Sequence, residues 1–347
     1  MSKPIQHILV IRLSAMGDVA MSVPVLRAFT EQYPDIKLSV LTKPFFKPLF
    51  RDISNLDVVE ADVKGKHKGV FGLYRLSKTL KQKQIEAIAD LHNVLRSKLL
   101  RVFLFSIFSK KIDKGRTEKK ALVKGNQFEP LKSTHQRYAD VFENLGFPID
   151  LSSATFPKPY QLNQKINQVL GGLTRPMIGI APFAAFEGKA YPLSKMEDVI
   201  RAISKSVTVV LFGSSGQEAT QLQDLEDEYQ NVINIAGKLN LNEELDLISN
   251  LDLMVSMDSG NAHLAAMLGV EVITIWGVTH PYAGFYPFHQ DPNNAVLADR
   301  NKFPRIPTSV YGNSYPEGYE QVFETITPDD IISKVKTVLK KKPHSKE

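Results

Sequence analysis

The chain has 347 residues, of which 43% are hydrophobic and 23% charged, with a formal net charge of +6 and no cysteine. This composition is that of a globular protein, and the length predicts about two domains. The lack of cysteine excludes a disulfide scaffold, thiolate catalysis and any metal site that needs thiolate ligands. The mild basic excess permits an anionic partner, but it does not call for nucleic acid, and we expect no nucleic-acid binding.

The N-terminal half alternates short apolar runs with helical patterns, which is typical of parallel α/β units. Its first apolar run predicts a core strand rather than a signal peptide, and no stretch approaches the roughly 20 apolar residues of a membrane span. We therefore expect a cytoplasmic protein. The elements predicted here are strand Ile8–Leu13, helix Val19–Gln32, strands Lys37–Leu41 and Ile85–Asp90, and a helix from Val94.

The pattern dissolves around Gly146–Tyr160, which contains Pro157 and Pro159 and predicts a linker. Strands are then predicted at Met177–Ala181, Val207–Phe212, Val232–Ile235, Leu253–Ser256 and Val272–Trp276. Helices are predicted at Ser194–Ser204, Gln217–Tyr229, Asn242–Asn250 and Gly260–Leu268. The segment Thr279–Tyr319 is rich in Pro, Gly, Tyr and Asn and predicts irregular surface, and a last helix is expected after Thr327 and Pro328.

This alternation predicts two parallel α/β domains with a cleft between the carboxyl ends of their sheets, where such folds bind ligands. The expected boundaries are an N-terminal domain over residues 1–160, a C-terminal domain over 161–326, and a C-terminal helix and tail over 327–347.

The first motif, Arg12-Leu-Ser-Ala-Met-Gly-Asp18, joins a strand to a helix start. The exposed N–H groups of a helix start attract anions, so the motif suits a ligand site. Asp18 is either a catalytic carboxylate or an acid that complements the helix dipole, which is worth about 0.3–1 kcal/mol at an exposed site. Arg12 is either a functional cation or a surface charge at the strand end.

The second motif, Asp258-Ser-Gly-Asn-Ala-His263, follows an apolar strand. Asp258 and Ser259 are good N-cap residues, and Gly260 lets a phosphate approach the backbone N–H groups of the helix start. His263 lies in the first turn, where it could face the same ligand, although a lone histidine more often belongs to the core.

Two further positions lie in strand-to-helix loops of the second half. Lys189 is either a point charge for phosphate or an ordinary surface lysine. Glu218 either accepts hydrogen bonds from a ribose or serves as an acid in the first turn of its helix.

Several known motifs are missing from the sequence. It has no Gly-x-Gly-x-x-Gly, no P-loop, no His-Glu-x-x-His and no Gly-x-Ser-x-Gly. The eight histidines are scattered, so we expect neither a metal site nor a bound cofactor.

The chain nevertheless resembles a known family. It resembles the bacterial heptosyltransferases, glycosyltransferase family 9, in the order and spacing of four elements. These are the two motifs that begin at Arg12 and Asp258, together with the segments Lys189-Ala-Tyr-Pro192 and Asn93-Val-Leu-Arg96-Ser97. The resemblance implies a GT-B fold, with two Rossmann-like domains whose parallel sheets face a central cleft. It also implies inverting transfer of a sugar, most simply heptose from ADP-heptose, onto a phosphorylated glycolipid of the lipopolysaccharide inner core.

The resemblance assigns roles to particular residues. Asp18 is similar to the general base, and Arg12, Ser14, Gly17 and Arg96 to acceptor-binding positions. Donor binding is implied for Lys189, Glu218, Asp258, Ser259, Gly260 and His263. Tyr191 stands where many members have Trp, and a cysteine-containing motif is missing near Pro304–Tyr311, so a hexose or another sugar stays open.

Other functions also stay open. A nucleotide-sugar epimerase or a non-catalytic nucleotide-sugar-binding protein would have a similar two-domain build.

The stretch from Arg96 to Lys124 contains ten basic residues and only two acidic ones, Asp113 and Glu118. This stretch suits either contact with the inner face of the inner membrane or a solvated charged surface, since basic residues are attracted to anionic lipid by about 1 kcal/mol each.

Overall fold

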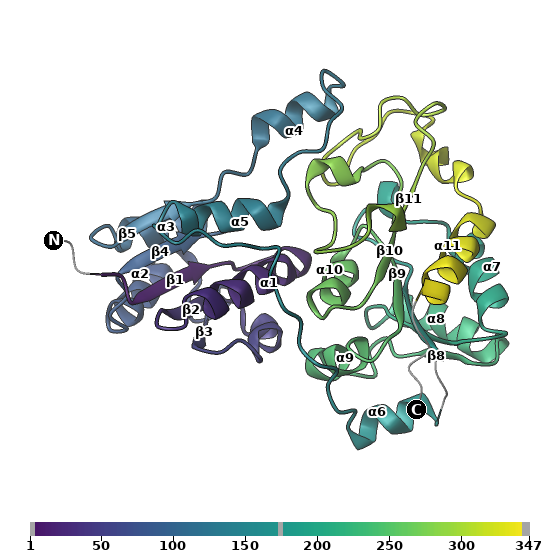
Figure 1. Ribbon diagram of the computed structural model, residues 1–347, viewed down its shortest axis with the longest axis horizontal. Helices are drawn as coiled ribbons and strands as arrows, with labels where there is room; N and C mark the ends of the chain where they lie inside the picture. The colour runs from purple at the N-terminus through teal and green to yellow at the C-terminus, as the bar shows by residue number, and fades with distance from the viewer. Residues whose placement is uncertain (1–3, 173–175, 342–347) are drawn as a thin grey trace. The chain divides into compact units, whose positions relative to one another are not determined.

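The computed structural model describes residues 4–172 and 176–341, and its contacts divide the chain into two units (Figure 1). Unit 1 takes the chain up to Gly115 and then Lys132–Pro157. Unit 2 takes Arg116–Leu131 and the chain from Lys158 onward. Each unit is built on its own parallel sheet, as the alternation of apolar runs and helices predicts.

The sheet of unit 1 has the strand order β3-β2-β1-β4-β5. Its strands are β1 (His7–Ile11), β2 (Lys37–Thr42), β3 (Leu56–Glu60), β4 (Ala87–Asp90) and β5 (Phe108–Lys111). The central strand β1 pairs with β2 from His7 opposite Lys37 and with β4 from Ile8 opposite Ala87. The residues of β1 after His7 are all buried, because helices cover both faces of such a sheet.

Helices lie on both faces of this sheet. They are α1 (Met16–Gln32), η1 (Pro44–Phe50), α2 (Gly69–Lys81), α3 (Leu95–Phe103) and α5 (Thr134–Glu143). Apolar side chains of α2 and α3, such as Leu76 and Leu100, share one core with Leu9 and Ile88 of the strands. Helices α1 and α5 pack against each other, with the rings of Phe29 and Phe142 4.7 Å apart.

The sheet of unit 2 has the order β11-β10-β9-β6-β7-β8. Its strands are β6 (Met177–Ala181), β7 (Thr208–Leu211), β8 (Val232–Asn234), β9 (Leu253–Met257), β10 (Val272–Trp276) and β11 (Ala295–Leu297). Strand β6 pairs with both β7 and β9, so the chain adds strands first on one side of β6 and then on the other.

The α-helices of unit 2 are α4 (Arg116–Val123), α6 (Gln164–Leu170), α7 (Leu193–Ile203), α8 (Gln217–Glu228), α9 (Leu241–Ile248), α10 (Gly260–Met267) and α11 (Pro328–Lys341). Its 3₁₀ turns are η2 (Glu187–Lys189), η3 (Pro281–Ala283), η4 (Pro292–Asn294) and η5 (Tyr319–Thr325). Helix α11 starts at Pro328 as predicted, and the Asp330 N–H donates to Thr327 Oγ1, which confirms Thr327 as its cap.

The structure corrects two expectations about domain organisation. The N-terminal domain is not continuous over 1–160, because Arg116–Leu131 packs with unit 2; the Leu131 N–H donates to the Tyr282 carbonyl at 2.9 Å. The C-terminal helix is not separate from its domain either, since Ile331, Val335 and Val338 are buried in the core of unit 2. Residues 342–347 of the expected tail lie outside the described residues.

The segment Thr279–Tyr319 is also more than irregular surface. Strand β11 lies within it and pairs with β10, and Phe288, Val296 and Ile306 are buried. None of the helices in the described parts of the chain is long and apolar enough to cross a membrane.

Candidate functional site

The candidate site residues of unit 1 lie at the switch point of its sheet. The chain leaves β1 toward β2 on one side, and later places β4 on the other side of β1. Ligands of open parallel sheets bind beyond the carboxyl ends of the strands at such a point. Arg12 and Asp18 follow β1, and Leu91 and His92 follow β4.

Arg12 is held there by three groups. Its Nη1 donates to the Leu91 carbonyl at 2.7 Å, and its Nη2 lies 2.6 Å from Asp18 Oδ2. The guanidinium carbon lies 5.7 Å from the centre of the Tyr138 ring. Because the Arg12 side chain is only 6% exposed, it is a fixed buried cation rather than a mobile surface charge.

The two carboxylate oxygens of Asp18 differ in their contacts. Its Oδ2 accepts from the Ala15 N–H at 3.2 Å as well as pairing with Arg12, and its backbone carbonyl accepts from the Tyr138 hydroxyl. Within the described residues both side-chain contacts use Oδ2. Oδ1 is therefore available to another group, and the side chain is one-third exposed.

His92 completes this arrangement as a neutral ring. Burial, together with the Arg12 charge, lowers the pKa of His92 to about 3. Its Nδ1 accepts from the Leu13 N–H at 3.4 Å, so the neutral ring carries its proton on Nε2. Behind it, the buried Asp90 accepts from the His92 N–H and lies 3.2 Å from Arg101 Nε.

The other predicted acceptor residues are divided by the structure. Ser14 and Gly17 lie half-buried in the turn that carries Asp18. Arg96 is exposed in the first turn of α3, and in the part of the chain that the structure describes it shares no hydrogen bond or ion pair with Arg12 or Asp18.

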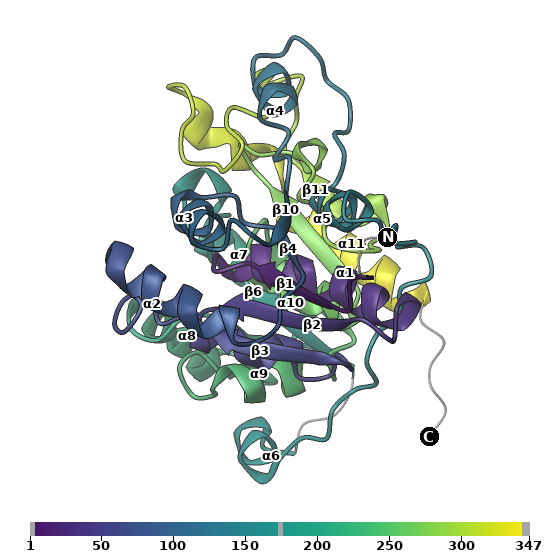
Figure 2. The same cartoon turned by 90° about the vertical axis from the view of Figure 1, so that its left-hand side faces the viewer.

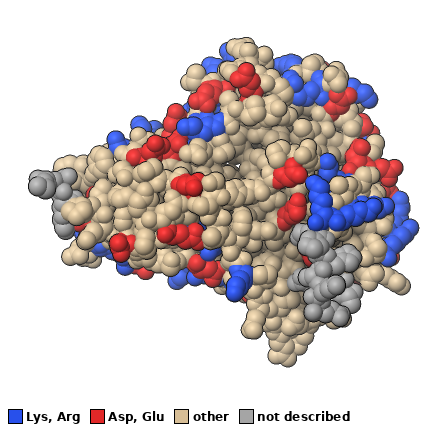
Figure 3. All heavy atoms as spheres, viewed as in Figure 1, with Lys and Arg blue, Asp and Glu red and all other residues tan. Residues whose placement is uncertain are grey.

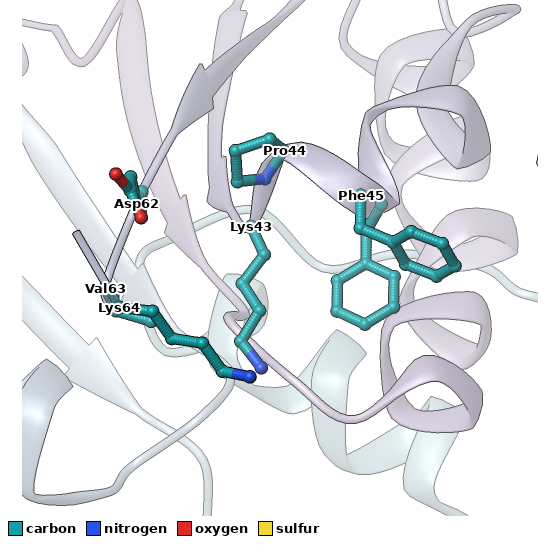
Figure 4. A pocket seen from close by; sticks show the side chains of 8 residues that line it. Lys43, Pro44, Phe45, Asp62, Val63 and Lys64 are labelled. Carbon is teal, nitrogen blue, oxygen red and sulfur yellow. The ribbon is translucent and has the colours of Figure 1, made fainter. Parts of the chain in front are cut away.

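A pocket of about 320 Å³ lies at the carboxyl ends of β2 and β3. Lys43, Phe45 and Lys64 are among its lining residues, and in the view of Figure 4 the ends of the two lysine side chains converge. Asp62 also lines it, but its carboxylate accepts from the backbone N–H groups of Lys66 and Gly65, which lower its pKa. The sequence reasoning missed this cationic pocket.

In unit 2 the candidate residues again lie at the switch point of the sheet, between β6 and β9. Lys189 in the turn after β6 places its Nζ 2.9 Å from Oδ2 of Asp258, which follows β9. Thr279, which follows β10, donates its hydroxyl to the same oxygen at 3.0 Å. Both charged side chains are at least 85% buried. An ammonium has three donors, and within residues 4–172 and 176–341 Asp258 is the one recorded partner of Lys189 Nζ, which leaves two donors for a ligand.

At the start of α10, Asp258 does not have the N-cap role that the sequence suggested for it. Ser259 is its N-cap residue, whereas the Asp258 carboxylate is engaged by Lys189 and Thr279 instead of capping the helix. Ser259 Oγ lies 3.0 Å from Ser256 Oγ. Gly260 is the first helical residue, and His263 is buried in the first turn. Asp258, which pairs with Lys189, directly precedes the N-cap residue of this helix.

Glu218 and Tyr191 make hydrogen bonds that stabilise the fold of unit 2. Glu218 Oε2 accepts from both the N–H and the hydroxyl of Ser214, at 2.7 and 2.8 Å, which closes the loop between β7 and α8. Tyr191 is 2% exposed and its hydroxyl donates to the Ile326 carbonyl, so this ring belongs to the core of unit 2. In the described parts of the chain, no hydrogen bond or ion pair links either side chain to Lys189.

The sequence reasoning missed several contributors. Thr279 could have been found, because it is a polar residue just after a buried strand, like Asp258. Tyr138 and Gly312 carry no such signal, since their contacts with Asp18 and Lys189 are long-range. Among the described residues no cluster of three or more His, Asp or Glu side chains could hold a metal ion.

Comparison with known proteins identifies the family. Residues 73–309 match glycosyltransferase family 9 (heptosyltransferase). The chain belongs to glycosyltransferase family 9. It is 28% identical over 362 residues to lipooligosaccharide heptosyltransferase 2 of Haemophilus influenzae, covering 96% of this chain and 100% of that protein. The predicted family and the predicted glycosyltransferase activity are confirmed.

Solved structures agree with the family 9 assignment. A glycosyltransferase family 9 protein from Veillonella parvula superposes with a TM-score of 0.77 at 20% identity, covering 99% of each chain. The E. coli ADP-heptose lipopolysaccharide heptosyltransferase II gives a TM-score of 0.69 at 23% identity, covering 96% of this chain and 98% of that one. The predicted GT-B fold of two Rossmann-like domains is confirmed, and the cleft between them stays a prediction.

Proposed function

We propose that this family 9 enzyme transfers heptose from ADP-heptose, with inversion, onto a phosphorylated glycolipid of the lipopolysaccharide inner core. The observation that carries the proposal is that each unit gathers its candidate polar residues at the switch point of its own sheet. The names of its relatives, which include lipooligosaccharide and lipopolysaccharide heptosyltransferases, support heptose and this class of acceptor.

On the donor side, the leaving group is a nucleoside diphosphate on which negative charge grows as the bond to the sugar breaks. Lys189 and the first-turn N–H groups of α10 at Ser259 and Gly260 supply fixed positive ends for that charge. Removing one such donor costs about 3–4 kcal/mol in comparable sites. Asp258 and Thr279 orient the lysine, and His263 lies in the same turn.

On the acceptor side, the attacking hydroxyl must lose a proton as its oxygen bonds to the anomeric carbon. Asp18 Oδ1 is the group proposed to take it, while Arg12 and the Ala15 N–H hold Oδ2. The hydroxyl oxygen forms a bond to the anomeric carbon, and the bond between that carbon and the diphosphate oxygen breaks. The diphosphate leaves with the electron pair of the broken bond, and this single displacement inverts the anomeric carbon. Lys43 and Lys64 are proposed to bind a phosphate of the acceptor.

The variant Asp18→Asn tests the assignment of the base. It keeps a side chain of the same shape but cannot take the proton, so turnover should fall at least about 100-fold while donor affinity stays near normal. Steady-state kinetics and donor titration measure the two quantities. Asp35→Asn, at an exposed acid of the same unit, is the matched control. Turnover within a few-fold of wild type would contradict the assignment.

A panel of nucleotide sugars separates the proposal from the two alternatives. Each donor is incubated with the protein, with and without a lipid A–inner-core acceptor. An epimerase would convert its donor without acceptor, and a non-catalytic protein would bind a donor without converting it. The proposal requires conversion of ADP-heptose only when the acceptor is present.

An acceptor of this kind is anchored in lipid, so we also propose that the enzyme works at the inner face of the membrane.

A further inference from the structure

Large apolar side chains are exposed on α2 and α3 of unit 1. Phe71 on α2 is 88% exposed, Leu95 on α3 is 72% exposed, and Phe105, just after α3, is 83% exposed. Single apolar residues are common on protein surfaces, but a cluster of large ones marks a site of interaction. The surface around them therefore needs a partner.

Helical spacing shows that these residues do not serve the core. On α2, Phe71 and Tyr74 are one turn apart and exposed, whereas Leu73, Leu76 and Leu80 are buried. On α3, Leu95 and Val102 are two turns apart and exposed, whereas Leu100 is buried. Each helix is therefore apolar on its core side and again on its outer side.

The two outer sides form one surface. Helices α2 and α3 pack together (Figure 2). The ring centres of Tyr74 and Phe103 lie 5.5 Å apart. We define the α2–α3 face as Phe71, Tyr74, Leu95, Val102 and Phe105.

The segments that carry this face contain no acidic residue. Residues 63–85 hold seven basic residues and no Asp or Glu: Lys64, Lys66, Lys68, Arg75, Lys78, Lys81 and Lys83. Residues 91–112 hold five and again no acid: Arg96, Lys98, Arg101, Lys110 and Lys111. Lys78 Nζ lies 4.9 Å from the centre of the Tyr74 ring, so charge and aromatic surface adjoin. The face of unit 1 seen in Figure 3 differs, because it carries acidic as well as basic side chains.

We propose that the α2–α3 face docks on an anionic phospholipid bilayer. Exposed aromatic and aliphatic side chains enter the boundary between headgroups and acyl chains, and the surrounding lysines and arginines bind the lipid phosphates. The excess of basic residues in these two stretches of the sequence suits a negatively charged surface. The choice of a lipid over a protein partner rests on the proposed function, whose acceptor is a glycolipid.

The proposal also changes the surface that the sequence suggested for membrane contact. The basic stretch Arg96–Lys124 is divided between the two units at Gly115. Lys119 of that stretch is buried, with its Nζ 3.9 Å from the centre of the Phe285 ring. Only the part of the stretch on α3 and β5 belongs to the α2–α3 segments.

Vesicle sedimentation tests the proposal on the full chain. Wild-type protein should bind vesicles of phosphatidylcholine mixed with phosphatidylglycerol, and bind pure phosphatidylcholine vesicles poorly. Binding should weaken in about 1 M salt, where the Debye length is about 3 Å. The double variant Phe71→Ser/Phe105→Ser should lose at least about tenfold in vesicle affinity. The control double variant Phe156→Ser/Leu297→Ser, at exposed apolar residues elsewhere, should bind as wild type.

Thermal unfolding of both double variants checks that they fold, and transfer to a water-soluble acceptor fragment should be unchanged in both. Equal binding to neutral and anionic vesicles would overturn the proposal, and so would wild-type vesicle binding by Phe71→Ser/Phe105→Ser. If wild-type protein self-associates but does not bind vesicles, and Phe71→Ser/Phe105→Ser alone abolishes the self-association, the α2–α3 face binds a second copy of the chain and the lipid proposal is wrong. Because vesicle binding needs no turnover, its failure is distinct from a failure of sugar transfer.

Discussion

Lys189 is positioned by packing as well as by charge. Its Nζ pairs with Asp258, and its stem lies against Gly312, which has φ +76°. A Cβ at Gly312 would lie 2.4 Å from Lys189 Cγ. The glycine therefore meets two requirements, a left-handed backbone and a close approach of the lysine stem.

The variant Gly312→Ala should displace Lys189 and weaken donor binding. We expect the KM for the donor to rise by about tenfold, which corresponds to about 1.4 kcal/mol. The matched control is Gly318→Ala, because Gly318 has φ +86° but no atom near its would-be Cβ. Both variants strain the backbone, and only Gly312→Ala should change the donor KM. An equal change in both would contradict this role for Gly312.

Lys64 provides a test of the pocket at the ends of β2 and β3. If it binds an acceptor phosphate, Lys64→Ala should raise the KM for the acceptor by about tenfold and leave the donor KM unchanged. Initial rates at varied acceptor concentration measure the effect. Lys158→Ala, at an exposed lysine of unit 2, should leave both constants unchanged. A larger donor than acceptor effect of Lys64→Ala would argue against an acceptor site.

Glu244 in the first turn of α9 gives a pH-dependent contribution to stability. Burial raises the pKa of Glu244 to about 7, so between its ordinary value and 7 the folded chain holds a proton that the unfolded chain releases. The free energy of unfolding therefore falls as pH rises from the ordinary glutamate pKa to about 7, and this contribution is lost above 7. Glu244→Gln keeps the neutral form and should be more stable than wild type by about 1–2 kcal/mol at pH 8.5.

Urea unfolding at pH 4.5 and 8.5 checks this prediction for Glu244. The stability difference between Glu244→Gln and wild type should be small at the lower pH and should appear at the higher one. Glu317→Gln, at an exposed acid of the same unit, should show no such difference. A difference of the same size at both pH values would rule out titration of Glu244 as its cause.

At the scale of elements, the strands predicted best are those buried on both faces. Strands β1, β6 and β9 are continuous apolar runs, because helices cover both sides of their sheets. The edge strands β3 and β5 were missed, since Asp57, Glu60 and Lys110 interrupt their apolar pattern. Helix α2 was missed as well, because its exposed Phe71 and Tyr74 obscure the usual contrast between a core side and a solvent side.

The segment Arg116–Leu131 depends on a small aromatic cluster. The ring of Phe128 lies 4.9 Å from that of His280 and 4.8 Å from that of Tyr282, and the guanidinium carbon of Arg300 lies 3.3 Å from the Phe128 ring centre. Burial and the Arg300 charge lower the pKa of His280 to about 4, so its ring packs in the neutral form. Phe128 thus adds three ring contacts to the Leu131 hydrogen bond and the Lys119–Phe285 contact that also attach the segment to unit 2.

The variant Phe128→Ala should therefore release this segment. Aromatic pairs and cation–π contacts are each worth about 1 kcal/mol, so the detached population should rise by at least about tenfold. Limited trypsin digestion after the exposed Lys124 measures it. Phe105→Ala, at an exposed ring outside the cluster, is the control, and equal cleavage rates in the two variants would contradict the role of Phe128.

For the whole molecule, the family, the two-domain α/β class and the residues after the strands could be predicted from local sequence. Arg12, Asp18, Lys189 and Asp258 follow apolar strands, and this position alone places them at the carboxyl edge of a sheet. Their partners could not be predicted, because the contacts of Tyr138, Thr279 and Gly312 join residues that are far apart along the chain. The reassignment of Arg116–Leu131 to unit 2 likewise depends on tertiary contacts.

That reassignment has a consequence for engineering the enzyme. The polypeptide passes from one unit to the other at residues 115/116, 131/132 and 157/158. A chimera that joins this N-terminal half to the C-terminal half of a homologue at a single junction near 158 would leave Phe128 facing a foreign aromatic cluster. A graft that keeps these contacts must carry residues 116–131 together with unit 2, so the crossover points follow the tertiary contacts of the segment and not its position in the sequence.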